Sequence, residues 1–103
     1  MAAHWIRLTE VCTRLQVDDD LLRVVREEGL LEIKESTESE AVISSDDAER
    51  LRLIRVLMRE MDVNLAGVEV ILHMHHDLCS MQRQFDAILR SLVSELRQRV
   101  GGA

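Results

Sequence analysis

The feature that most limits the fold is one long apolar seam in the second half of the chain. Between positions 71 and 92, apolar residues recur in unbroken alternating steps of three and four: Ile71, Met74, Leu78, Met81, Phe85, Ile88 and Leu92. Such a heptad seam indicates a helix that packs against another helix. The chain has no proline, and the next glycine is Gly101. We therefore expect a single helix of about 35 residues, roughly 50 Å long.

This seam needs a cover that the rest of the chain is too small to provide. An exposed seam of this length would be an unusually large apolar patch. The same helix from a second copy is a self-complementary cover, so we expect a two-fold homodimer. Glu95 ends the seam, and the apolar line shifts to Leu89, Val93, Leu96 and Val100. The expected organisation is a domain at 1–63 and a coiled-coil dimerisation helix at 64–103, which ends in a short flexible Gly-Gly-Ala tail.

The first part of the chain shows the pattern of two short helices followed by a hairpin. Thr9 and Asp18 are expected to cap these helices, because short polar side chains accept hydrogen bonds from free N–H groups. Gly29 is expected to end the second helix in the left-handed conformation. The apolar runs 30–33 and 41–43 flank a polar loop, which predicts a small two-stranded wing.

Two further caps complete the expected fold. Ser44 precedes Asp46 and Asp47, which is a typical start for a third helix, and Asn64 can cap the last one. The predicted fold class is mainly α: a winged helix-turn-helix with a small two-stranded wing, followed by a long C-terminal dimerisation helix.

Several classes of function are excluded or disfavoured by what the sequence lacks. It contains no nucleophile elbow, glycine-rich phosphate loop or CxxC motif, so we do not expect an enzyme. No run approaches about 18 apolar residues, and no apolar leader follows Met1. We therefore expect a cytoplasmic protein that does not bind membranes.

One cluster could hold a metal ion. It consists of His73, His75, His76 and Cys79, and His75 and Cys79 share one helix face at a spacing of four. The alternative is that two of the histidines are solvated helix residues and that the other side chains pack near the seam. We favour this alternative and expect no metal and no cofactor. Equilibrium dialysis with zinc would test this expectation.

The order of elements and several short segments resemble the MerR-type winged-helix group. The resembling segments are 8–11 (LTEV), 26–31 (REEGLL), 45–51 (SDDAERL) and 61–68 (MDVNLAGV). Segment 26–31 is similar to the group's ERxGLL stretch.

Over nearly its whole length the chain is similar to a narrower family, the chaperone modulatory proteins of the CbpM type. The shared features are the acidic helix start at 17–22 (VDDDLL), the Asp-Asp-Ala at 46–48, the join at 64–68 and the C-terminal seam helix. This resemblance implies a homodimer that binds the J-domain of a DnaJ-like (CbpA-type) co-chaperone. Such a modulator inhibits the co-chaperone's action with a DnaK-type chaperone and influences its DNA binding.

The second helix differs from that of the DNA-reading MerR relatives. They carry a T-[IV]-R-Y-Y-E run, whose side chains reach phosphates and groove edges. The matching run here is 20–26 (DLLRVVR), in which valine replaces both tyrosines and only the arginines could contact DNA. A MerR-type transcription regulator with altered DNA contacts therefore remains the alternative interpretation.

The distribution of charge favours a protein partner over nucleic acid. Residues 1–43 contain five basic and ten acidic residues, so they carry −5 of the chain's net charge of −6. This charge repels phosphates, and we expect no direct nucleic-acid binding. It suits a basic surface such as the second helix of a J-domain. The candidate contact residues are Asp18, Asp19, Asp20, Leu21, Leu22, Glu27, Glu28 and Glu32, with Leu30 as a further apolar anchor.

Overall fold

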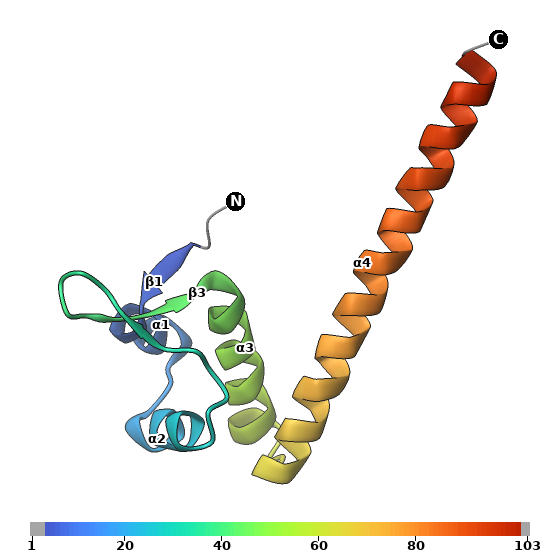
Figure 1. The fold of residues 1–103 in the computed structure, drawn as a ribbon. Coiled ribbons are helices and arrows are strands. Elements are labelled where there is room, and N and C mark those ends of the chain that lie inside the picture. Colours follow the sequence, from blue (N-terminus) through green and yellow to red (C-terminus); the bar gives the residue numbers. More distant parts are fainter. Residues whose placement is uncertain (1–3, 102–103) are drawn as a thin grey trace. The chain divides into compact units, whose positions relative to one another are not determined.

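The structure is a computed structural model that describes residues 4–101, and it confirms the predicted fold class (Figure 1). A small sheet and three short helices precede one long helix. In chain order the elements are β1 (Trp5–Arg7), α1 (Leu8–Leu15), α2 (Asp19–Glu27), β2 (Lys34–Glu35), β3 (Ala41–Ser44), α3 (Ser45–Arg55), a π-helical turn η1 (Val56–Glu60) and α4 (Leu65–Gly101).

The first two helices end in the same way. At the end of α2, the N–H of Leu30 donates to the carbonyl of Val25, and Gly29 has a φ of +64°. This is a Schellman motif, and it confirms Gly29 as the expected left-handed residue. At the end of α1, Gln16 takes the corresponding place with a φ of +58°. The start of α1 differs from the prediction: the helix begins at Leu8, directly after β1, without the expected threonine cap.

The sheet differs from the predicted two-stranded wing. It has three antiparallel strands in the order β1-β3-β2, because the N-terminal strand pairs with β3. The first strand of the wing, β2, is an edge strand and begins at Lys34, after the predicted run 30–33. That run forms its hydrogen bonds elsewhere: Leu30 closes the end of α2, and the N–H of Glu32 donates to Asp47 of α3 over 2.9 Å.

The remaining caps lie where the sequence predicted them. The Ser44 hydroxyl accepts from the N–H of Asp47 at the start of α3, over 3.1 Å. The Asn64 side chain accepts from the N–H of Gly67 at the start of α4, over 2.8 Å. A Cβ on Gly67 would lie 2.8 Å from the Val63 side chain, which explains the glycine there. Helix α4 has 37 residues, close to the expected length.

The core of the winged-helix part draws on every layer of it. Its fully buried side chains come from α2, β3, α3 and the first turn of α4, and they are Leu21, Val25, Ile43, Leu51, Ile54 and Val68. All of these side chains are apolar, and no polar or charged residue is buried among the described residues, so apolar burial is what stabilises this core.

Replacing Ile54 by alanine is expected to lower the free energy of unfolding by about 2–5 kcal/mol, because it removes buried methyl groups and leaves a cavity. Ile54 is 0% exposed. Urea denaturation at a fixed protein concentration measures the change, and Ile54→Val, expected to lose about 0.5–1.5 kcal/mol, is the matched control. Equal stability of the alanine variant and the wild type would show that Ile54 is not a core residue.

The chain divides into two compact units between Val68 and Glu69. The expected boundary was at 63/64, and the difference arises because the first turn of α4 contributes Val68 to the core of the first unit. Gly101 is the last residue of α4, and the other two residues of the predicted flexible tail lie outside the described residues. Within the part of the chain that the structure describes, no helix is long and apolar enough to cross a bilayer.

Candidate partner-binding surface

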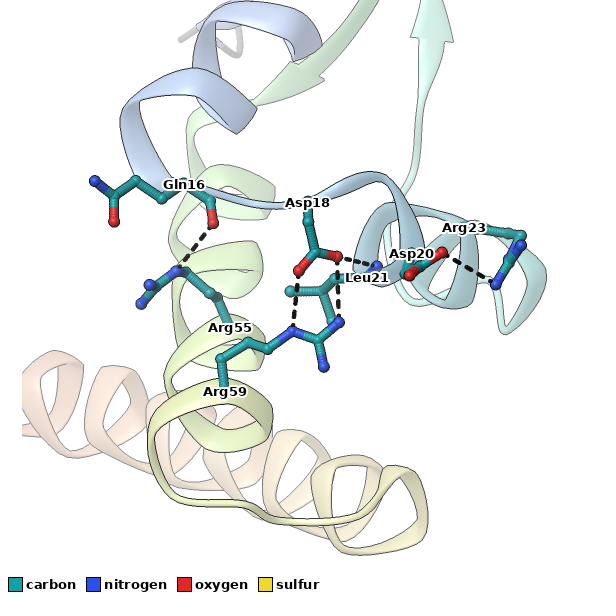
Figure 2. Close-up of polar contacts among 7 residues, drawn as sticks. All are labelled: Gln16, Asp18, Asp20, Leu21, Arg23, Arg55 and Arg59. Atoms are coloured by element: carbon teal, nitrogen blue, oxygen red, sulfur yellow. Dashed lines mark hydrogen bonds and ion pairs between the residues drawn. The ribbon is translucent and has the colours of Figure 1, made fainter.

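Asp18 stands at the start of α2 and has two roles (Figure 2). Its Oδ1 accepts from the N–H of Leu21 over 2.7 Å, which confirms it as the helix cap. Both carboxylate oxygens also accept from the guanidinium of Arg59 in η1, each over 3.2 Å. Both of its oxygens are thus already bonded within the chain. Among the candidate contact residues, Asp18 is the one that accepts two hydrogen bonds from a single guanidinium.

Arg55 reaches the same turn from the adjoining end of α3. Its Nε donates to the carbonyl of Gln16 over 3.3 Å, and its Nη1 lies 2.8 Å from Glu60 (Figure 2 shows the first of these contacts). Neither Arg55 nor Arg59 was expected at this surface from the sequence. Their spacing of four residues places them on one helix face, but nothing in the sequence connects them with residues about 40 positions earlier.

The three apolar candidates, two on α2 and one just after it, differ in burial. Leu21 is 1% exposed and belongs to the core, which corrects the expectation that it is a surface anchor. The reason is its place one helical turn before Val25, on the face that packs inward. Leu22 and Leu30 are half-buried and keep part of their side chains at the surface.

The acidic candidates lie on the outside of α2 and at the start of the wing. Asp19, Asp20, Glu27, Glu28 and Glu32 are all exposed. Two of them have cationic neighbours within the first unit: Asp20 lies 3.4 Å from Arg23, and Glu32 lies 3.5 Å from Lys34. For Asp19, Glu27 and Glu28 the described residues provide no ion-pair partner within 4 Å. These three carboxylates are the ones most available to a basic partner.

The guanidinium of Arg59, followed by the backbone N–H of Leu21, holds the pKa of Asp18 below its ordinary value of 3.8. A carboxyl whose pKa is lower in the folded state stabilises the fold when it is ionised. Its contribution is therefore fully present above the unfolded pKa and is lost as the pH falls through the folded pKa. We expect an NMR titration of the Asp18 carboxyl to give a midpoint below 3.8, and Arg59→Gln to raise it. A midpoint unaffected by that substitution would contradict the contact.

The predicted dimer seam lies along one face of α4. Ile71 is half-buried, and the other six residues are between 52% and 64% exposed in the single chain: Met74, Leu78, Met81, Phe85, Ile88 and Leu92. The second apolar line that follows the seam is exposed as well. Helix α4 therefore presents an apolar face that has no cover within its own unit.

The histidine and cysteine cluster on α4 does not form a set of three or more ligands. The Cys79 sulfur lies 3.8 Å from Nε2 of His75 and 3.9 Å from its Nδ1. His73 lies 3.5 Å from Asp77 on the same helix. Within residues 4–101 no group of three or more His, Cys, Asp or Glu side chains is arranged to hold a metal ion.

Comparison with known families connects this architecture with one of them. The family model described as MerR HTH family regulatory protein matches residues 6–90, which include the helix-turn-helix, the wing and most of α4. The chain belongs to the MerR family. Neither the curated proteins nor the solved structures gave a significant match.

In this MerR-family protein, α2 is the second helix of the helix-turn-helix. Arg23 and Arg26 are exposed on it, whereas Val25, at one of the positions where DNA-reading relatives carry tyrosine, is fully buried. The outer surface of α2 therefore offers two arginines among five flanking and internal carboxylates, two of which lie at its C-terminal end. Such a mixture gives a weakly attractive surface for phosphates at most.

Proposed function

We propose that this MerR-family protein is a chaperone modulator of the CbpM type, which binds the J-domain of a DnaJ-like (CbpA-type) co-chaperone and inhibits its action with a DnaK-type chaperone. One observation carries the proposal: Asp19, Glu27 and Glu28 are exposed acidic residues on the helix that DNA-reading relatives use to contact phosphates. The similarity of the sequence to chaperone modulatory proteins over nearly its whole length supports the choice of partner.

Inhibition would follow from occupation of the partner's basic surface. A J-domain engages the DnaK-type chaperone through its basic second helix, so an acidic surface that binds this helix competes with the chaperone. The half-buried Leu22 and Leu30 adjoin the carboxylates in sequence and provide apolar contact area. Charge attraction would mainly raise the association rate, while apolar contacts would slow dissociation.

The same proposal includes a homodimer formed through α4. Six seam residues of the single chain are more than half exposed, and monomeric proteins rarely expose large contiguous apolar patches. The seam repeats with the heptad spacing that lets identical helices interlock. A dimer would present two acidic surfaces, and hence two sites for J-domains.

The functional test is an ATP-turnover assay of a DnaK-type chaperone stimulated by its DnaJ-like co-chaperone. We expect the wild-type protein to reduce the stimulated rate toward the basal rate as its concentration approaches that of the co-chaperone. The basal rate without co-chaperone serves as the control and should not change. An undiminished stimulated rate at a tenfold excess of the protein would contradict the proposed inhibition.

A transcription regulator with altered DNA contacts is the second candidate. The family match and the exposed Arg23 and Arg26 on α2 favour it. Fluorescence anisotropy with labelled duplex DNA separates the two candidates, because phosphate contacts make binding fall steeply with salt. Tight, salt-sensitive binding to duplex DNA together with no binding to a J-domain would support the regulator.

A further inference from the structure

Two arginines, one helical turn apart, form hydrogen bonds to the connection between α1 and α2. Arg55 and Arg59 lie four residues apart, at the end of α3 and within η1, and both reach toward the turn of the helix-turn-helix (Figure 2). Arg55 donates to the Gln16 carbonyl, and Arg59 donates two hydrogen bonds to the Asp18 carboxylate. We call these two arginines and the segment 16–18 the arginine clamp.

The form of the clamp indicates a geometric role. The side chains of Asp18 and Arg59 are 55% and 41% exposed, and exposed ion pairs contribute little to stability. Two parallel hydrogen bonds from one guanidinium nevertheless fix the direction of the carboxylate. Since Asp18 is also the cap of α2, its direction is coupled to that of the first turn of the helix. Backbone strain accompanies the contact, because Gln16 holds a positive φ without being a glycine.

Arg59 lies on the π-helical turn η1, which is anchored in the core of the first unit. In η1 the N–H of Met61 donates to the carbonyl of Val56, five residues earlier, over 3.0 Å. Such turns are rare inside helices and occur frequently at functional sites. Here the turn carries Arg59, and its buried residue Leu57 anchors it in the core of the first unit.

We propose that Arg59, supported by Arg55, is a positioning residue that orients the acidic surface of α2 toward its partner. This inference rests on the proposed function, because the partner is the J-domain of that proposal. The clamp does not contact the partner. It acts through Asp18, which sets the direction of the helix that carries Asp19, Glu27 and Glu28.

Replacing Arg59 distinguishes a positioning role from simple charge attraction, because the two predict opposite changes in the affinity for the J-domain. Arg59→Gln makes the protein more acidic by one charge, so attraction alone predicts tighter binding to a basic partner. Positioning predicts weaker binding, because α2 loses its fixed orientation. Arg52→Gln is the matched control: this arginine is exposed on α3, lies 3.6 Å from Glu49, and carries the same charge.

Isothermal titration of each variant with an isolated J-domain tests the proposal. We expect Arg59→Gln to weaken binding about fivefold, Arg59→Lys to recover part of the loss, and Arg52→Gln to bind as tightly as the wild type or more tightly. Circular dichroism checks that all the variants are folded. Equal or tighter binding by Arg59→Gln would overturn the positioning role.

Hydrogen exchange keeps this test independent of the proposed function. In Arg59→Gln, the amides of α2 are expected to exchange about fivefold faster, while those of α1 remain as protected as in the wild type. If the wild type does not bind a J-domain, the proposed function fails, and the exchange of α2 alone decides whether the clamp orients that helix. Unchanged exchange in α2 would overturn the clamp in either case.

Discussion

Reversing two carboxylates of α2, with Asp19→Lys and Glu28→Lys in one variant, is expected to weaken J-domain binding about tenfold to a hundredfold. The two residues lie at opposite ends of α2 and are both exposed. The change shifts the net charge of the chain from −6 to −2 and places like charges against a basic partner. The fold should persist, because Asp18 still caps the helix and Leu21 and Val25 remain buried.

A second charge reversal of the same size shows whether the position of the charges matters. Glu49→Lys with Glu69→Lys makes an identical change in net charge outside α2 and the wing. We expect this control to retain binding within about threefold, since exposed charges outside the contact surface are screened at physiological salt. If the two variants bound equally well, the acidic surface of α2 would not be the contact.

Replacing Phe85 by glutamate is expected to convert a dimer into a monomer at micromolar concentrations. Phe85 lies in the middle of the seam and is 60% exposed in the single chain. In a dimer the substitution would bury a carboxylate on each helix without a partner, which costs far more than the lost apolar contact alone. The monomer has a mass of 11.8 kDa, so light scattering coupled to size exclusion would show the mass falling from about twice that value.

Ala87→Glu is the matched control for the seam. Ala87 is exposed and lies two residues further along, which places it on nearly the opposite side of the helix. We expect this variant to keep the mass of a dimer. A wild-type protein that remains at 11.8 kDa at high concentration would refute the homodimer itself.

The sequence predicted the helices and most of their ends, though not the start of α1, because each depends on residues close together in the chain. Asp18, Ser44 and Asn64 cap the helices that follow them, and Gly29 ends α2. The absence of a proline or glycine between Asn64's cap and Gly101, apart from Gly67 in the first turn, gave the length of α4 within a few residues. Local hydrogen bonds and periodic side chains decide such features, and a single sequence contains both.

The sheet and the clamp were predicted less well, because they depend on contacts between distant segments. Strand β1 pairs with β3 almost 40 residues later, which turns the expected two-stranded wing into a three-stranded sheet. Leu21 was assigned to the surface because its neighbours are acidic, whereas the packing of the whole domain buries it. The bond from Arg59 to Asp18 spans 41 positions and has no local signal.

The affinity of the wild-type protein for an isolated J-domain, measured by titration calorimetry at low and at high salt, tests the proposed function. We expect specific binding that weakens as salt screens the carboxylates of α2. The absence of binding at low salt, with tight binding to duplex DNA under the same conditions, would contradict it.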